Sequence, residues 1–431
     1  MVEKVKCKTE NCTAMILPST AESTGGVCMP CKRKADQAEY EKYIRQNRRT
    51  VDPFRGITDP IEIIKIRHEP RKHDPLIAYV PHPTPPAELY EELTQPELSR
   101  LIQHVLDNMG SSDSEAALEI AKELAAFTDA DLTRIQRAFL NIRKYYPGYL
   151  FRGASAGTSR KLIDRLGEVT VDSNDKVTLN HVLEALAWAD TDDVVSLFAE
   201  LRERPPQWRS QLYIPPERYA HCAGWELDPR SEMRKLTLGN CYPLIKSEHT
   251  LGIGPVTTCL ELMESCKWCR APLTSLFVFD LTNELLAFIP ARGRKLTILT
   301  CQVCSTLGDR LYMKVGPHGE AHWFAGSERP EYLPNDTSTW KRLPANELRL
   351  SPRPRLLHHA VDWCLPTTCS QIGGMPSWID DPAHGQCPEC SKGLVFVAQL
   401  AVEDVDAWGE GIYYALMCPD CSITTVRYQQ T

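Results

Sequence analysis

Apolar residues recur at helical spacing through residues 94–210. The clearest amphipathic patterns are QPELSRLIQHVLDNM after Thr94, then SEAALEIAKELAAF, DLTRIQRAFLNIRKYY, LNHVLEALAWA and DDVVSLFAEL. We expect Thr94 to cap the first of these helices, and Thr128 or Asp129 to cap the third. Because no fixed sequence period links the patterns, they predict a bundle or a few irregular helical repeats. Such a layer commonly scaffolds other domains or binds protein.

A different pattern begins at residue 211, where short apolar runs alternate with turns and tryptophans. The runs SLFVFDL, ELLAFI and KLTIL lie between Cys269 and Cys301, and GLVFVAQL and GIYYALM lie between Cys390 and Cys418. All five are typical of strands, so the pattern predicts a β-rich domain over residues 211–431.

The first 93 residues are more polar. Residues 1–50 form a small unit that ends in the polar helical pattern KRKADQAEYEKYIRQNRRT. Residues 51–93 are punctuated by prolines and predict an extended connector. Its runs IEIIKI and LIAYV are too apolar to stay in water, so we expect the connector to pack on its neighbours.

Composition places the chain among ordinary soluble proteins, since 42% of its 431 residues are hydrophobic and 24% are charged. The formal net charge of -7 argues against nucleic-acid binding by the chain as a whole. The charged start MVEKVKCKTE does not resemble a signal peptide, and no apolar stretch approaches the length that spans a bilayer. We therefore expect a cytoplasmic protein without membrane partners, in which thiols stay reduced unless they bind metal or act in catalysis.

The spacing of the cysteines is the strongest chemical signal. Of 17 cysteines, twelve fall into three sets of four. The first set is Cys7, Cys12, Cys28 and Cys31; the second is Cys266, Cys269, Cys301 and Cys304; the third is Cys387, Cys390, Cys418 and Cys421. The remaining five are Cys222, Cys241, Cys259, Cys364 and Cys369.

A Cys-x-x-Cys turn points two sulfur atoms at one centre, and two such turns joined by a hairpin form a closed tetrahedral site for structural zinc. The competing interpretations are disulfides, a redox pair and an iron–sulfur cluster. A reducing compartment disfavours the first, matched pairs that close hairpins disfavour the second, and the third lacks its usual clustered spacing. The sequence thus predicts up to three structural zinc ions, which act as scaffolding rather than in catalysis.

The second and third sets share one order of features. CKWCRAPLTSLFVFDL and CPECSKGLVFVAQL both read as cysteine pair, short turn and apolar strand, and each unit ends with a strand that enters a second pair. We interpret this as an internal duplication of a zinc-clasped hairpin. The predicted fold class is therefore an α+β multidomain protein: a zinc ribbon with a polar helix, a proline-rich connector, a central helical bundle, and a β-rich module that contains the duplicated hairpins.

Charge is unevenly distributed along the chain. Residues 1–50 carry ten Lys and Arg against six Asp and Glu, so they have a net charge of +4 and the remainder carries -11. A basic zinc ribbon could contact a nucleic-acid backbone through Lys32, Arg33, Lys34, Arg48 and Arg49. A solvated helix beside a structural zinc knuckle is the interpretation that we favour, because acidic residues alternate with the basic ones.

One phrase near the C-terminus resembles a known family. SQIGGMPSWI, followed by CPEC, FVAQL and GEGIYYALMCPDC, is similar to the family of bacterial YwqG proteins and eukaryotic programmed cell death protein 2. The resemblance covers about the C-terminal half. It implies a β-rich fold and a protein that binds another protein instead of acting as an enzyme. Its eukaryotic members are chaperones of a ribosomal protein, and its bacterial relatives include proposed immunity proteins of toxin systems. The positions that match the family and would bind a partner are Gln371, Gly373, Gly374, Pro376, Trp378 and Gln399.

The Gly373-Gly374 turn has a physical interpretation of its own. One glycine is expected to adopt positive φ, and both permit close approach of another chain. Pro376 stiffens the exit from the turn, and Trp378 either anchors it or forms one wall of a groove. Two interpretations remain open: a buried structural corner, or a peptide-binding groove beside an edge strand.

Signals for catalysis are weak. Pro317 and Gly319 place His318 and His322 in a loop or hairpin, and Cys364 lies near His358 and His359 without a readable oxyanion element. Asp380 and Asp381 predict a turn, and Glu403, Asp404 and Asp406 a solvated loop. We therefore expect a non-enzymatic protein whose acidic body binds a basic protein, such as a toxin or a ribosomal protein. Nucleic acid is the second choice of partner.

Overall fold

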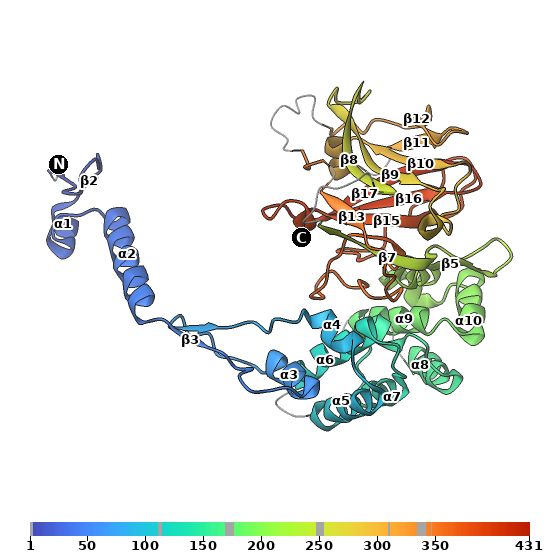
Figure 1. Cartoon of the computed structure of the whole chain (residues 1–431), viewed down its shortest axis with the longest axis horizontal. Helices are drawn as coiled ribbons and strands as arrows, with labels where there is room; N and C mark the ends of the chain where they lie inside the picture. Colours follow the sequence, from blue (N-terminus) through green and yellow to red (C-terminus); the bar gives the residue numbers. More distant parts are fainter. Residues whose placement is uncertain are drawn as a thin grey trace. The chain divides into compact units, whose positions relative to one another are not determined.

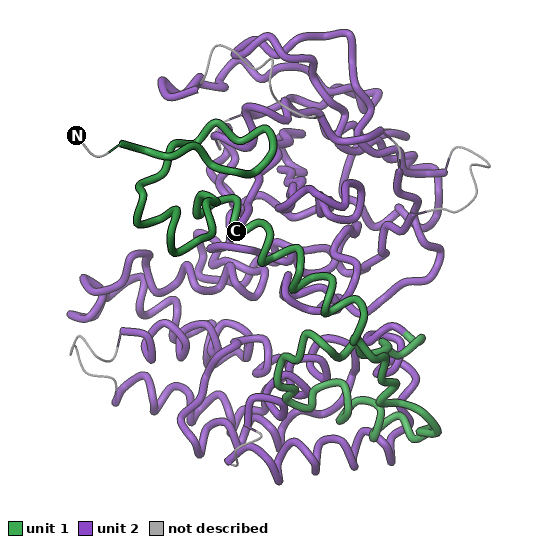
Figure 2. The backbone as a smooth tube through the Cα atoms, turned by 90° about the vertical axis from the view of Figure 1, so that its left-hand side faces the viewer, with its two compact units in different colours: residues 1–84 green, residues 85–431 purple. Residues whose placement is uncertain are grey.

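A computed structural model describes residues 3–110, 114–168, 176–246, 254–308, 311–333, 342–345 and 347–431. Figure 1 labels the helices and strands, and Figure 2 colours the two compact units into which the chain divides, Met1–Thr84 and Pro85–Thr431. The finer division at residues 50, 93 and 210 stays a prediction.

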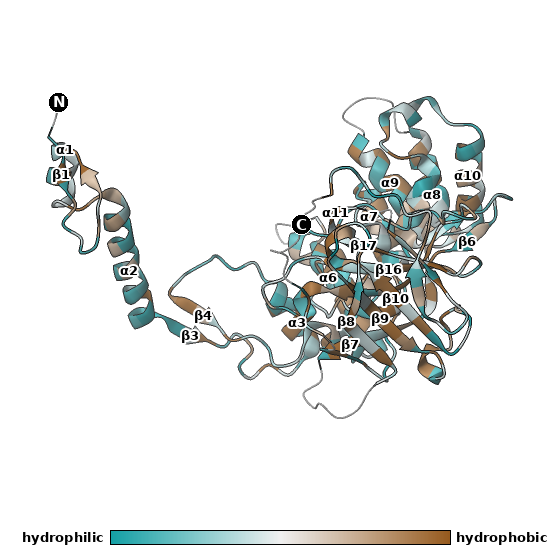
Figure 3. Cartoon of the chain, turned by 90° about the horizontal axis from the view of Figure 1, so that it is seen from above, coloured by the Kyte–Doolittle hydropathy of each residue, from teal (hydrophilic) through white to brown (hydrophobic). Residues whose placement is uncertain are grey.

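The first unit begins with a short antiparallel hairpin. Strands β1 (Val5–Lys6) and β2 (Met15–Ile16) are followed by helices α1 (Pro18–Thr24) and α2 (Met29–Asn47). None of the 19 residues of α2 is buried, and Figure 3 shows this helix as predominantly hydrophilic. The predicted polar helix is confirmed.

The proline-rich segment, residues 51–93, was expected to be extended, and this expectation is wrong in two places. Residues 86–91 form helix α4 (Pro86–Glu91), and residues 60–68 are helical as well. They form helix α3 (Pro60–His68), in which Ile61, Ile63 and Ile64 are buried. The side chain of Asp59 accepts a hydrogen bond from the amide of Ile61 at 3.0 Å, and Pro60 occupies the first turn, where no amide donor is needed. Strands β3 (Arg49–Val51) and β4 (Ile77–Tyr79) flank this helix in sequence and pair in parallel.

Helices form the first part of the second unit (Figure 1). Their bounds are α4 Pro86–Glu91, α5 Gln95–Asn108, α6 Ser114–Phe127, α7 Thr133–Asn141, η1 Gly148–Phe151, α8 Ala156–Glu168, α9 Lys176–Ala189, α10 Asp192–Glu203, η3 Gln207–Gln211 and η4 Pro216–Ala223.

Two helix caps were predicted here. Thr94 caps α5 as expected, and its amide donates to the carboxylate of Glu97 at 2.8 Å in a capping box. The cap predicted at Thr128 or Asp129 is wrong, because α7 begins at Thr133. The Thr128 hydroxyl instead donates to the carbonyl of Leu124 at 2.7 Å, so this residue completes the end of α6.

Strands dominate the rest of the unit. Their bounds are β5 Trp225–Leu227, β6 Met233–Lys235, β7 Leu238–Lys246, β8 Val256–Ser265, β9 Pro272–Asp280, β10 Lys295–Thr300, β11 Tyr312–Val315, β12 Ala321–Trp323, β13 Leu348–Leu350, β14 Gln371–Gly374, β15 Val395–Ala401, β16 Ile412–Cys418 and β17 Ile423–Gln429. The short helices are η5 Glu284–Leu286, α11 Gln302–Leu307 and η6 Val402–Asp404. ELLAFI was predicted as a strand, but the side chain of Asn283 accepts from the amide of Leu285 and starts η5 instead.

Two sheets share the main apolar core. One sheet has eight strands in the order β12-β11-β17-β16-β15-β14-β7-β13, and the other has three in the order β10-β9-β8. Buried residues from both sheets, such as Phe277 and Ile298 on one and Val397 and Ala415 on the other, form one apolar cluster. The opposite face of the large sheet contributes Phe396 and Tyr414 to a second cluster. Trp378 packs against this second cluster.

Candidate metal centres and an acid-lined cavity

The three predicted sets of cysteines are brought together by the fold. All 17 cysteines are free thiols. Within each set the four sulfur atoms lie within 4.8 Å of one another, and each set could hold a metal ion. A tetrahedral centre with metal–sulfur bonds of about 2.3 Å requires sulfur atoms about 3.8 Å apart. The Sγ–Sγ distances of 3.8 Å for Cys12–Cys28, 3.7 Å for Cys266–Cys304 and 3.6 Å for Cys390–Cys418 fit this requirement.

The second and third clusters begin with the same backbone turn. The amide of Cys266 donates to the carbonyl of Ala271 at 2.7 Å, and the amide of Arg270 donates back to the carbonyl of Cys266 at 3.0 Å. In the third cluster, Cys387 and Lys392 make the first of these bonds at 2.8 Å, and Ser391 and Cys387 make the second at 2.9 Å. Arg270 and Ser391, each directly after a cysteine pair, both adopt positive φ.

Each of these turns leads into one antiparallel hairpin, β9–β10 in the second cluster and β15–β16 in the third. A strand of the hairpin then delivers the second pair, which starts at Cys301 after β10 and at Cys418 at the end of β16. The hairpins predicted between the cysteine pairs are therefore present. Their common origin by duplication stays a prediction.

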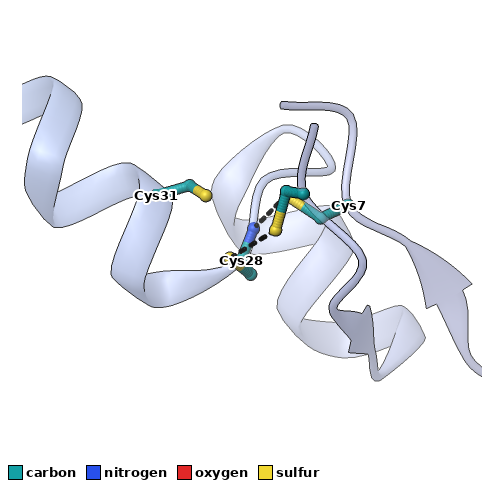
Figure 4. A group of neighbouring side chains, drawn as sticks. Cys7, Cys28 and Cys31 are labelled. Atoms are coloured by element: carbon teal, nitrogen blue, oxygen red, sulfur yellow. Dashed lines mark hydrogen bonds between the residues drawn. The ribbon is translucent and has the colours of Figure 1, made fainter. Parts of the chain in front are cut away.

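The first cluster joins a loop to the start of a helix. Cys28 is the N-cap of α2 and Cys31 lies in its first turn, and both side chains point toward Cys7 (Figure 4). The amide of Cys28 donates to Sγ of Cys7 at 3.2 Å. Hydrogen bonds from Thr9 and from this amide lower the pKa of Cys7 to about 6. A helix N-terminus stabilises the thiolate, and the thiolate is the form in which cysteine binds metal.

Proton sharing within the second cluster shows what a metal would change. Hydrogen bonds from Cys301 and Cys304 lower the pKa of Cys266 to about 2, while the same contacts raise the pKa of both donors. One buried thiolate is thus favoured at the expense of the others. A divalent cation would replace the shared protons and permit all four thiolates, which is the chemistry of a closed structural site.

The six residues of the resemblance lie together, and most of them are internal. Gly373 and Gly374 have φ of +69° and +70°, and both lie against other backbone. A Cβ atom would come within 2.0 Å of the Asn240 carbonyl oxygen at Gly373, and within 2.7 Å of Sγ of Cys241 at Gly374. The predicted positive φ is confirmed, and the segments that approach the two glycines belong to this same chain. Approach of another chain stays a prediction.

The two glutamines fasten this turn from inside, since both are fully buried. Gln371 accepts from the Arg355 guanidinium at 2.6 Å and donates to the carbonyl of Met375 at 2.7 Å. Gln399 accepts from the amide of Ser377 at 2.9 Å and donates to the carbonyl of Cys369 at 2.7 Å. Both side chains therefore have local structural partners.

The groove beside an edge strand is not present at this turn. Strand β14 lies between β7 and β15 and pairs with both, so it is not an edge strand to which a peptide could add. Pro376 and Trp378 instead line a cavity. The partner-binding role of the six residues stays a prediction.

The weak catalytic candidates do not form a catalytic pair. The ring of His359 contacts Glu91 at 3.3 Å and Thr367 at 2.9 Å, and burial lowers its pKa to about 3. Burial also raises the pKa of the Cys364 thiol, so this thiol is not activated. His322 lies on β12, which pairs with β11, and the predicted hairpin is confirmed.

A cavity of about 490 Å³ lies between the helical layer and the loops that cover the large sheet. Its walls come from η1 and the segment before it, from α9 and η4, and from residues 361–382. The lining combines aromatic and acidic side chains, and no Lys, Arg or His is among the described residues that line it. The aromatic members are Tyr146, Tyr149, Trp188, Trp363 and Trp378, and the acidic members are Glu184, Asp362, Asp380 and Asp381.

Glu184 on α9 is the acid that the protein environment perturbs most. Burial raises its pKa to about 7, the amide of Gly148 opposes this shift, and the charges of Asp362 and Asp381 add to it. Gly148 is its one hydrogen-bond donor among the described residues, at 3.4 Å to Oε1. A carboxylate that is desolvated, poorly paired and exposed to a cavity favours the arrival of a cation.

The remaining walls are held in place by a hydrogen bond and by contacts between aromatic rings. The Tyr149 hydroxyl donates to Asp362 at 3.3 Å. The Trp378 ring lies 4.4 Å from that of Tyr414 and 5.2 Å from that of His384. Its indole nitrogen is buried, and no described residue accepts a hydrogen bond from it.

Sequence reasoning missed this cavity. It treated Asp380 and Asp381 as a turn and gave Glu184 and Asp362 no role of their own. The local signal was an acid close to an aromatic residue: Asp362 directly precedes Trp363, and Asp380 follows Trp378 by two positions. Residues so far apart in the chain could be joined only by the fold.

These features define a class: an α+β protein with three four-cysteine clusters that could bind metal. A Salmonella typhimurium (strain LT2) protein described as "Uncharacterized protein YpfL" is 36% identical over 437 residues, and the match covers 100% of both chains. The chain therefore belongs to the YpfL family. No model of a protein family matches the chain, and no solved structure does either. None of the described helices is both long and apolar enough to cross a membrane.

Proposed function

We propose that this protein is a non-enzymatic, zinc-binding adaptor that holds a basic partner protein in its acid-lined cavity. The single observation that carries the proposal is the lining: four carboxylates and five aromatic side chains without a basic residue among the described ones. The unit that contains the cavity has 34 Lys and Arg against 45 Asp and Glu, a net charge of -11. Complementary charge accelerates association and selects basic partners.

Zinc is the metal that the clusters fit best in this proposal. Four thiolates at tetrahedral spacing leave no coordination position for a substrate. The third cluster lies at the base of β15 and β16, the strands that support Gln399 and Tyr414 behind the cavity wall. The metal would thus stabilise the sheet on which the cavity is built.

The resemblance to YwqG proteins and programmed cell death protein 2 supports two versions of this function. In the preferred version the protein is an immunity protein, and the basic partner is a toxin such as a nuclease. In the alternative it is a chaperone-like adaptor for a basic protein such as a ribosomal protein. Both versions place the protein in the cytoplasm, where reduced thiolates can hold zinc.

Affinity capture from the native cell tests the proposal. The baits would be the wild-type chain, Glu184→Gln, and Glu200→Gln as a matched control, since Glu200 is an exposed residue of α10 that does not line this cavity. We expect one basic protein in near-equal amount with wild type and the control, with less retained by Glu184→Gln. Equal recovery by all three baits, or recovery of acidic proteins only, would overturn the proposal.

A second candidate function rests on a separate observation in the first unit. Helix α2 has no buried residue and carries basic side chains at both ends, and residues 1–50 have a net charge of +4. This charge could hold nucleic acid through phosphate contacts. Binding with a steep salt dependence, lost when Lys32, Arg33, Lys34, Arg48 and Arg49 are replaced, would support this function. Weak binding that the replacements leave unchanged would exclude it.

A further inference from the structure

A second acid-lined cavity adjoins the first. It has a volume of about 240 Å³, and Trp363 and Ile379 line both cavities. Its acidic members are Glu403, Asp404 and Glu410, and no Lys, Arg or His is among the described residues that line it. The two cavities are therefore neighbours with a common wall and the same charge.

The acids of the second cavity are held differently from one another. Asp404 accepts a hydrogen bond from the amide of Ser370 at 2.8 Å, and the Ser370 hydroxyl accepts from the amide of Ala401 at 2.9 Å. Asp404 is therefore tied to the backbone beside β14 and β15, rather than lying in a freely solvated loop as the sequence predicted. Glu403 and Glu410 are exposed at the rim. One fixed and two exposed carboxylates can pair with a cation that enters from solvent.

The common wall is suited to a chain that passes from one cavity to the other. Trp363 is 39% exposed although it borders both cavities, so part of its ring is open to a ligand. Aromatic faces attract cations and cover the apolar stems of lysine and arginine side chains. A segment that lies across Trp363 could place one basic side chain on each side of it.

We infer that the two cavities form one bipartite site for an extended segment of the partner protein, with a cationic side chain in each cavity. This inference rests on the proposed function and adds the form of the ligand: two basic residues on one short segment. In an extended segment, alternate side chains point to the same face about 7 Å apart. Once one basic side chain is bound, the other is held near its own cavity at a high effective concentration. The affinity of the segment therefore exceeds that of either contact alone.

A peptide series tests the inference on the full chain. Fluorescein-labelled, blocked peptides of glycine and serine would carry one lysine, or two lysines separated by one to five residues. Binding would be followed by fluorescence anisotropy at low salt. We expect the best two-lysine peptide to bind at least about tenfold more tightly than the one-lysine peptide. In Glu403→Gln/Glu410→Gln this advantage should fall to within about twofold, while one-lysine peptides still bind through the first cavity.

The outcomes separate this inference from the proposed function. If one-lysine peptides bind wild type but not Glu184→Gln, and a second lysine adds nothing at any spacing, the bipartite site is wrong and the first cavity still binds cations. If the double variant weakens one- and two-lysine peptides equally, only diffuse charge is at work and the inference is also wrong. If no peptide of the series binds, both the inference and the cation-binding cavity are overturned.

Discussion

Replacing Glu184 by glutamine should stabilise the protein at neutral and alkaline pH while it weakens partner binding. Glutamine keeps the shape of the side chain and an oxygen that can accept from the amide of Gly148. It removes only the charge. The variant therefore removes the free-energy cost of burying a charged carboxylate and keeps the packing of α9 against η1.

The magnitude follows from the pKa of this carboxyl group. Burial raises that pKa from an ordinary value of 4.5 to about 7. Between these two pH values the folded state holds a proton that the unfolded state has released, so the free energy of unfolding falls as pH rises. Each pH unit in this window costs about 1.4 kcal/mol, so the loss is up to about 3 kcal/mol above pH 7. The neutral amide of the variant avoids this loss.

The assay is urea unfolding, followed by tryptophan fluorescence at pH values from 5 to 8. We expect wild type and Glu184→Gln to be closest near pH 5, and the variant to be more stable by up to about 3 kcal/mol at pH 8. Glu200→Gln, at an exposed position of α10, should follow wild type at every pH. The variant should also bind the basic partner more weakly at pH 8.

Two results would refute this reasoning. A stability difference that does not depend on pH would show that Glu184 is ionised without cost, and that burial does not govern its pKa. A variant that is more stable yet binds the partner as tightly as wild type would remove Glu184 from the binding site.

Three further predictions concern metal and the turn beside the cavity. Elemental analysis should give about three zinc ions per chain; Cys266→Ser should lose one, whereas Cys364→Ser, outside the clusters, should lose none. Gly374→Ala should lower the free energy of unfolding by about 2–4 kcal/mol, because alanine is strained at positive φ and its Cβ would clash with Cys241. Gly239→Ala on β7, where a Cβ meets nothing within 4 Å, should change it by less than about 1 kcal/mol in the same urea titration. Gln399→Leu should cost about 2–4 kcal/mol by thermal and urea unfolding, because it leaves the buried amide of Ser377 and the carbonyl of Cys369 without partners; a cost below about 0.5 kcal/mol would contradict the role assigned to this side chain.

Local chemistry in the sequence was enough to predict many of the elements. Cysteine spacing identified all three clusters, because a Cys-x-x-Cys turn needs only a few neighbouring residues to aim two sulfur atoms. Helical periodicity identified α5, α6, α9 and α10, because the spacing of apolar residues within one helix is also a local signal. Errors arose where one polar side chain decides between two structures, as with Thr128, which ends α6 instead of starting α7.

The cavity could not be predicted in this way. Its acids come from α9 and from two places in the loops that follow β13, and no sequence pattern connects them. The raised pKa of Glu184 depends on burial, which exists only after the helical layer and the sheet have packed. The Gly373-Gly374 turn shows the intermediate case: its positive φ was predictable, but its place between two strands depended on sheet order.

Site-specific crosslinking in the native cell tests the central claim most directly. A photo-reactive phenylalanine analogue would replace Trp363, which lines both cavities, or Tyr213, which is 95% exposed and lines neither. The account predicts that one basic protein is crosslinked from position 363 and not from position 213, and that added Glu184→Gln reduces the crosslink. The same crosslinked proteins from both positions, or none from position 363, would contradict the claim that the cavity holds a basic partner.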